Sequence, residues 1–222
     1  MDEIASRCKP VRVPRWWPLV AAIAVGATAG LVIALTRNPS EPQPATGATA
    51  GAYETWAPGA RRARSFTLRD DRGAPISVPA RGSPTVVTFL DPVCRSLCPV
   101  EARILASAVR ELGPLAPQVV SVSVDPPADT PANFRTDARE WRLPPSWRWA
   151  VGSTPVLARV WQSYGVSVEV QQTKLAGVSV RNVVHDEEAY LVDRSGFVRA
   201  LFIFPFRAQD VERAVRAIGS AR

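Results

Sequence analysis

Residues 85–99 read TVVTFLDPVCRSLCP and carry the strongest fold signal in the chain. The run from Thr85 to Leu90 is β-branched and apolar, as expected for a strand that is buried on both faces. A helix should follow, because apolar residues recur at 3.6-residue spacing from Val100 to Leu112 and Pro99 suits its first turn. Residues 118–124 (QVVSVSV) alternate as a second strand. A strand, a helix and a strand with short connections predict a βαβ unit with parallel strands.

The segments after this unit continue the alternation. The pattern predicts further helices and short strands at residues 131–141, 147–151, 156–164, 189–192, 197–204 and 207–218. Asp129 or Thr130 should cap the first of these helices, and Gly165 should end the next. Residues 193–196 (DRSG) join two apolar runs and indicate a hairpin. This order is that of a thioredoxin-like α/β domain, although the pattern alone also fits other α/β folds.

Composition excludes several classes of protein. The 222-residue chain is 46% hydrophobic and 21% charged, which is typical of a globular protein and not of a disordered or collagen-like chain. Three cysteines are too few for a disulfide scaffold, and one histidine excludes any site that needs two imidazoles. The net charge of +7 comes without a basic run or interleaved aromatics, so we expect no nucleic-acid partner.

The N-terminal segment predicts a membrane anchor. Residues 16–35 are twenty positions without a charge, and a helix of this length spans about 30 Å, the thickness of a bilayer core. Basic residues outnumber acidic ones in residues 1–15, so the N-terminus should be cytoplasmic and the rest extracytoplasmic. A signal peptide cleaved after Ala27-Thr28-Ala29 is the alternative. Apolar residues continue to Leu35, which favours an uncleaved anchor.

These signals divide the chain into four parts. Residues 1–15 form a cytoplasmic tail and residues 16–35 the single transmembrane anchor of a cell-membrane protein. Residues 36–60 are rich in Pro, Ala, Thr and Gly and form a flexible linker. Residues 61–222 form the thioredoxin-like domain, which is long enough to bury a hydrophobic core without stabilising disulfides or structural metals. Cys8 lies in the tail and is separated from the other two cysteines.

Cys94 and Cys98 lie between the first strand and its helix, where residues four apart point to the same side and the two sulfur atoms can meet. The helix N-terminus and the charge of Arg95 favour the thiolate form and a lowered pKa. The pair can form a disulfide in an oxidising compartment. A purely structural disulfide over so short a loop would remove little chain entropy, so we interpret the pair as functional.

A third ligand near the two cysteines would favour metal binding over thiol–disulfide chemistry without a metal. Two thiolates suit Cu(I), and His185 is the imidazole that would complete a three-coordinate site, with Asp186 or Glu187 orienting its ring. The alternative is a surface histidine beside a metal-free thiol–disulfide oxidoreductase that uses Cys94 and Cys98 as its redox pair. A peroxiredoxin-like peroxidase is less favoured, because Asp91 stands where that class has Thr or Ser.

Three motifs together resemble the SCO/SenC family. They are Cys94-x-x-x-Cys98-Pro99, the run SVDPPADTP at residues 123–131, and His185 shortly before Tyr190-Leu191-Val192-Asp193. Members of that family are membrane-anchored, thioredoxin-like copper-binding proteins of cytochrome c oxidase assembly. The resemblance extends from about Phe66 to Phe204. It departs at Arg95, where many members have Pro, and at Val184, where many have Asp.

The resemblance implies a copper site formed by Cys94, Cys98 and His185. It also implies delivery of copper, reducing equivalents or both to the dinuclear copper subunit of a terminal oxidase. A disulfide does not bind copper in this way, so metal loading implies a thiol reductant as a further partner. A tether to the membrane would keep such a donor within reach of a membrane-bound acceptor.

Overall fold

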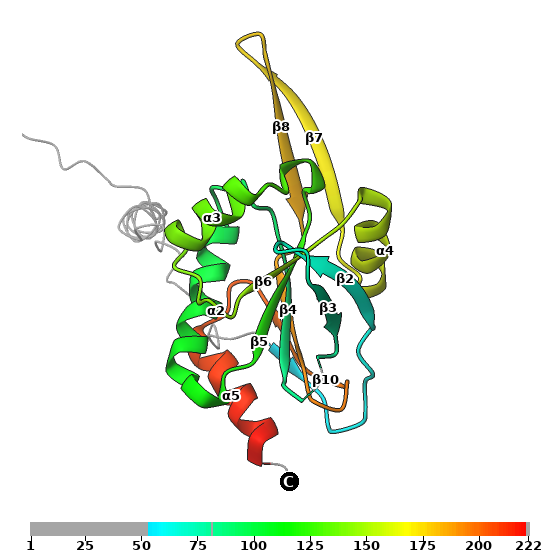
Figure 1. Cartoon of the computed structure of the whole chain (residues 1–222), viewed down its shortest axis with the longest axis vertical. Coiled ribbons are helices and arrows are strands. Elements are labelled where there is room, and N and C mark those ends of the chain that lie inside the picture. Colours follow the sequence, from blue (N-terminus) through cyan, green and yellow to red (C-terminus); the bar gives the residue numbers. More distant parts are fainter. Residues whose placement is uncertain (1–52, 81, 221–222) are drawn as a thin grey trace, which may run out of the picture. The chain divides into compact units, whose positions relative to one another are not determined.

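The computed structural model describes residues 53–80 and 82–220, which form one mixed sheet with helices on both faces and one projecting hairpin (Figure 1). The predicted tail, the predicted anchor at residues 16–35 and Cys8 lie outside the described residues. Within the described part of the chain, no helix combines the length and the apolar character needed to cross a membrane.

The main sheet has eight strands in the order β1-β10-β9-β4-β5-β6-β2-β3. Strand β4 pairs in parallel with β5, which pairs in parallel with β6, and the other neighbours are antiparallel. This confirms the predicted βαβ unit. The strands are β1 (Tyr53–Thr55), β2 (Phe66–Asp70), β3 (Pro75–Val78), β4 (Thr85–Leu90), β5 (Gln118–Ser123), β6 (Arg148–Val151), β9 (Glu188–Val192) and β10 (Val198–Ile203).

Four α-helices pack on this sheet. They are α2 (Cys98–Leu112), α3 (Pro131–Glu140), α4 (Thr154–Tyr164) and α5 (Ala208–Ser220). All four were predicted, and Thr130 caps α3 by accepting a hydrogen bond from the backbone N–H of Asn133, 3.2 Å away. Gly165 ends α4 in the left-handed conformation, with φ +85°, which a side chain would strain. Two short 3₁₀ turns, Gly113–Leu115 and Pro126–Ala128, complete the connections.

The core lies in two layers, one on each face of the sheet. Val86 and Leu90 of β4 face the layer that includes α2 and α5, whereas Val87 and Phe89 face the layer that includes α4. Figure 1 shows α2 and α5 on one side of the sheet and α4 on the other. Every residue of β4 is buried, as its unbroken apolar run predicted. The position of β4 in the middle of the sheet therefore makes the loop after it a firmly supported platform.

The segment between α4 and β9 forms a second, two-stranded sheet. Strands β7 (Val168–Leu175) and β8 (Val178–His185) pair antiparallel over their whole length around a turn at Ala176 and Gly177, both with positive φ. The hairpin stands out from the domain in Figure 1. It was not predicted, because most of β8 is exposed and little apolar alternation marks it.

The N-terminal edge of the sheet begins earlier than composition indicated. Residues 36–60 read as a linker, yet Tyr53–Thr55 pair antiparallel with Ala200–Phe202 of β10. Tyr53 also packs on Phe202, with ring centroids 5.5 Å apart. The sheet therefore takes up residues that precede the predicted boundary at 61.

Candidate metal centre

The sheet topology brings the ends of distant segments to one place. The loop after β4 carries Cys94 and leads into α2, which starts at Cys98. Strand β9 runs antiparallel to β4, with Ala189 opposite Thr88, so the residues just before β9 lie beside the end of β4. Those residues follow His185, the last residue of β8. The pairing of β4 with β9 therefore places the histidine segment against the cysteine loop.

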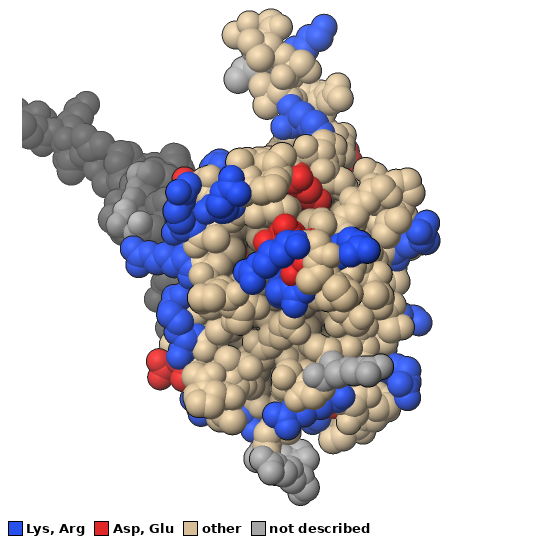
Figure 2. Space-filling view, in the orientation of Figure 1, with Lys and Arg blue, Asp and Glu red and all other residues tan. Residues whose placement is uncertain are grey.

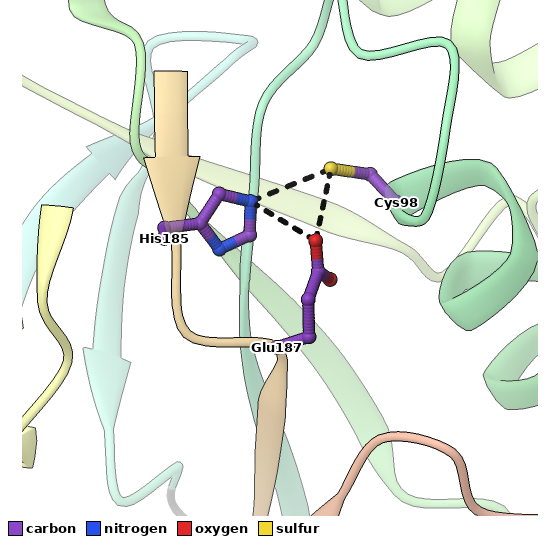
Figure 3. Close-up of side chains that lie close together, drawn as sticks. All are labelled: Cys98, His185 and Glu187. Carbon is purple, nitrogen blue, oxygen red and sulfur yellow. Dashed lines mark hydrogen bonds and ion pairs between the residues drawn. The ribbon is translucent and has the colours of Figure 1, made fainter. Parts of the chain in front are cut away.

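Cys98, His185 and Glu187 form a cluster of ligand atoms that all lie within 4.8 Å of one another (Figure 3). The Sγ of Cys98 is 3.5 Å from Nε2 of His185 and 3.8 Å from Oε1 of Glu187. The same Nε2 and Oε1 atoms are 3.4 Å apart. Cys98 is fully buried, and the side chains of His185 and Glu187 are only 3% and 14% exposed. The structure brings Cys98 and His185 together, whereas the sequence offered Glu187 only as a partner that orients the ring.

The histidine ring has a defined orientation. Its Nδ1 lies 3.0 Å from the backbone carbonyl oxygen of Asp186, and since a carbonyl oxygen only accepts, Nδ1 carries the proton. The other ring nitrogen, Nε2, then faces the sulfur of Cys98. The carboxylate of Asp186 is used elsewhere, accepting a hydrogen bond from the backbone N–H of Ser167 at 2.8 Å. The ring is thus oriented by the main chain of Asp186 and not by an acidic side chain.

Cys94 lies beside this cluster without being part of it, and it is the more acidic thiol. Its Sγ is 3.4 Å from Oγ of Ser96 and 3.5 Å from the backbone N–H of Ser96. A hydrogen bond from the thiol of Cys98, supported by those from Ser96, lowers the pKa of Cys94 to about 5 despite partial burial. The same interaction and burial raise the pKa of Cys98. Both cysteines are free in this structure.

Arg95 does not act on the thiols as the sequence suggested. Its Nη1 donates to the backbone carbonyl of Cys94 at 3.0 Å and lies 3.8 Å from Oδ1 of Asp137. Asp137 is fully buried and has no other partner among the described residues. Arg95 therefore offsets a buried carboxyl group, and local hydrogen bonds favour the thiolate of Cys94.

The acidity of Cys94 gives a measurable prediction. At pH 6 a thiol with a pKa of about 5 is about nine-tenths ionised, whereas an ordinary cysteine is well under 1% ionised. Iodoacetamide should therefore modify Cys94 far faster than Cys98 at pH 6, with a rate that falls only below about pH 5. Peptide mass mapping on a Cys8→Ser background measures both sites. Equal modification of the two cysteines at this pH would contradict the assignment.

A second carboxyl group supports Glu187 from behind. Glu101, in the first turn of α2, is fully buried and interacts with Glu187. Thr88 of β4 donates to Oε1 of Glu101. Burial, together with the neighbouring Glu187, raises the pKa of Glu101 well above its usual value. The raised pKa favours the neutral form of Glu101, which lies next to Glu187.

The run SVDPPADTP links the cysteine loop to the hairpin. Asp125 is 2% exposed, and its Oδ2 accepts a hydrogen bond at 2.5 Å from Nη1 of Arg181 on β8. Asp129 accepts from the hydroxyl of Ser123 at 2.6 Å. Burial raises the pKa of Asp91 to about 6 and that of Asp129 to about 7, and the nearby charge of Asp125 adds to both shifts. Figure 2 shows Asp and Glu gathered in a small group below the hairpin, with Lys and Arg beside them.

The contacts of two residues at this site were not predicted from the sequence. Glu187 was considered, but its distance of two residues from His185 gave no sign that its oxygen reaches the sulfur of Cys98. Arg181 was not singled out, because its partner Asp125 lies 56 positions away. An isolated arginine on an unrecognised strand carries no local signal of such a contact.

Comparison with solved structures shows the fold of known relatives. ScoI of Bradyrhizobium japonicum with copper bound superposes with a TM-score of 0.60 at 23% identity, covering 70% of this chain and 98% of that chain. ScoI of Arabidopsis thaliana with copper bound gives 0.61 at 22% identity, with coverages of 71% and 98%. BsSco is a member of the Sco family of cytochrome c oxidase assembly proteins in which a disulfide switch was identified. It superposes with a TM-score of 0.57 at 18% identity, covering 76% of this chain and 99% of that chain.

Comparison by sequence agrees with the fold. No curated protein matches the chain. The family model SCO1/SenC matches residues 55–220, which is most of the chain and nearly all of its described part. That range contains both cysteines of the loop, the SVDPPADTP run and the histidine. The chain therefore belongs to the SCO1/SenC family.

Proposed function

We propose that this protein is a membrane-anchored, extracytoplasmic protein that binds one copper ion through Cys94, Cys98 and His185. It passes copper, reducing equivalents or both to the dinuclear copper site of a terminal oxidase. The observation that carries the proposal is the approach of Nε2 of His185 to Sγ of Cys98, at 3.5 Å, while Nδ1 contacts the backbone carbonyl of Asp186. The copper-bound ScoI relatives support the choice of metal.

The donor set fits Cu(I) in its chemistry. Thiolates are soft ligands, and Cys94 supplies one near neutral pH because its pKa is lowered to about 5. Cys98 gives up its proton on binding, as metal-bound thiols do. His185 contributes a neutral nitrogen whose orientation the carbonyl of Asp186 maintains. Cys94 hydrogen-bonds Cys98, so a small movement of the exposed cysteine loop brings its sulfur into the set.

The surface around the site supports transfer to a protein partner. Apolar side chains are exposed on the cysteine loop and the first turn of α2, at Val93, Leu97 and Val100. A second exposed group lies along the projecting hairpin, at Val170, Val178, Val180 and Val184. Exposed apolar groups that surround a site are typical of protein contact surfaces. A membrane-bound acceptor would contact both the loop and the hairpin as it receives the copper.

A Cu(I) titration tests the proposal. The full-length chain in mild detergent, with Cys8→Ser and with reduced thiols, is titrated with Cu(I) against a coloured chelator. We expect one equivalent of copper per chain, and none in protein whose Cys94 and Cys98 have first been oxidised to a disulfide. The oxidised protein is the matched control, because only two hydrogen atoms distinguish it. Absence of stoichiometric uptake by the reduced protein would refute the proposal.

A metal-free thiol–disulfide oxidoreductase is a second candidate, favoured by the acidic Cys94 next to a protonated Cys98. The thiolate of Cys94 would attack a partner disulfide and release one partner thiol, and Cys98 would then attack Cys94 in the mixed disulfide and release the second partner thiol. Two thiols become one disulfide, and the partner gains two electrons and two protons. This activity needs no imidazole, so it should survive His185→Ala, whereas Cu(I) binding should not.

A further inference from the structure

Two sets of ligand atoms overlap at the metal centre. The set used for Cu(I) in the proposed function has two sulfur atoms and one nitrogen. The set that the structure already brings within 4.8 Å is different, with Cys98, His185 and Glu187. It has one sulfur, one nitrogen and one oxygen, and both sets share Cys98 and His185. Figure 3 shows the carboxylate of Glu187 pointing at the other two side chains.

Glu187 is held in this position from several sides. Its side chain is 14% exposed, and it interacts with the fully buried Glu101. Thr88 in turn donates to Glu101 from the middle of the sheet. Glu187 is therefore positioned by a buried residue of α2, which β4 supports, and not by solvent. A carboxylate that is oriented by buried partners is typical of ligand groups in metal sites.

The three atoms need a cation or a proton between them. Nε2 of His185 lies 3.4 Å from Oε1 of Glu187, and Sγ of Cys98 lies 3.5 Å from that nitrogen and 3.8 Å from that oxygen. Two acceptors so close together repel each other unless a positive centre is shared. A divalent ion bound by the thiolate, the imidazole and the carboxylate satisfies all three at once.

The chemistry of the oxygen ligand selects a class of ion. A carboxylate is a hard ligand that Cu(I) disfavours, whereas Cu(II), Co(II) and Zn(II) accept mixed sulfur, nitrogen and oxygen sets. Building on the proposed function, we propose that Glu187 binds divalent metal together with Cys98 and His185, taking the position that Cys94 occupies for Cu(I). The chain thus has separate third ligands for cuprous and for divalent ions beside a shared pair.

Cobalt(II) tests this inference without oxidising the thiols. The full-length chain with Cys8→Ser and Cys94→Ser retains only the proposed divalent set, and it is titrated with Co(II) without oxygen. We expect one equivalent with the visible bands of a four-coordinate ion and a thiolate charge-transfer band. Adding Glu187→Gln should weaken binding by at least about tenfold and shift the visible bands, because an amide is a poorer ligand. The matched control is Glu188→Gln, whose carboxylate accepts from the hydroxyl of Tyr190 instead, at 2.6 Å.

The outcomes separate this inference from the proposed function. Unchanged Co(II) affinity and spectrum in the Glu187→Gln protein would overturn the inference, as would an equal loss with Glu188→Gln. With both loop cysteines present, Glu187→Gln should change Cu(I) affinity by less than about threefold, and a large Cu(I) loss would overturn the division of ligands. If the parent protein binds Co(II) through Glu187 but takes up no Cu(I), the proposed function fails while Glu187 stands as a divalent-metal ligand.

Discussion

His185→Ala should weaken Cu(I) binding by the reduced protein more than about 100-fold. Loss of an outer hydrogen-bond partner of a metal ligand already costs about 10- to 100-fold, and here the ligand itself is removed. Cys94 and Cys98 remain, so residual binding should be that of two thiolates, with an open third position. Competition with a Cu(I) chelator of known affinity measures the difference. No other described residue can replace the ring, because the chain has a single histidine.

The matched control is Asp186→Asn. This change keeps the backbone carbonyl that accepts from Nδ1 of His185, and the new amide oxygen can still accept from the N–H of Ser167. Copper affinity should therefore change by less than about threefold. A large effect of Asp186→Asn would show that the carboxylate orients the ring after all. An unchanged affinity in His185→Ala would remove the imidazole from the copper site and favour the metal-free oxidoreductase.

Arg181→Gln should both destabilise the domain and weaken Cu(I) binding. Arg181 reaches Asp125 at 2.5 Å, and Asp125 is buried with its other oxygen unpaired among the described residues. Removing the guanidinium leaves a buried carboxylate without its counter-charge. We expect the free energy of unfolding to fall by about 2 kcal/mol, less than for a fully buried pair because Arg181 is 35% exposed. Denaturant titration measures this change.

Copper affinity should respond because Arg181 fixes the strand that carries His185. The hairpin β7–β8 is outside the main sheet, so this ion pair is one of its few polar attachments to the domain. We expect Cu(I) affinity to fall by about tenfold. The double variant Arg181→Gln/Asp125→Asn should recover part of the stability, because it no longer buries an unpaired charge.

Lys174→Gln is the control for charge alone. It removes one positive charge from β7 of the same hairpin at an exposed position. Stability and Cu(I) affinity should both stay close to those of the parent protein, since exposed charges contribute little. If Lys174→Gln lowers Cu(I) affinity as much as Arg181→Gln, the effect arises from net charge and not from the position of the hairpin.

The fold was predictable where local pattern and burial coincide. Thr85–Leu90 is buried on both faces, so its apolar run is unbroken, and strand β4 has the predicted bounds. Helix α2 follows from apolar spacing, and Pro99 lies in its first turn. The hairpin β7–β8 was not predictable in this way, because its pairing is antiparallel over exposed residues and buries little. Tyr53–Thr55 likewise forms a strand only because it pairs with the distant strand β10.

The sequence by itself determined which metal-binding side chains are present and that the two cysteines lie between a strand and a helix. A short apolar strand followed by Cys94, Cys98 and Pro99 is a local pattern. Only the tertiary structure decided which atoms meet. Cys98 and His185 are 87 positions apart, and Cys98 and Glu187 are 89 apart. Their contact depends on the pairing of β4 with β9, and a one-residue change in that register would turn the segment away. Side-chain direction at such a junction follows from strand pairing and hydrogen bonds, which neighbouring residues in sequence do not encode.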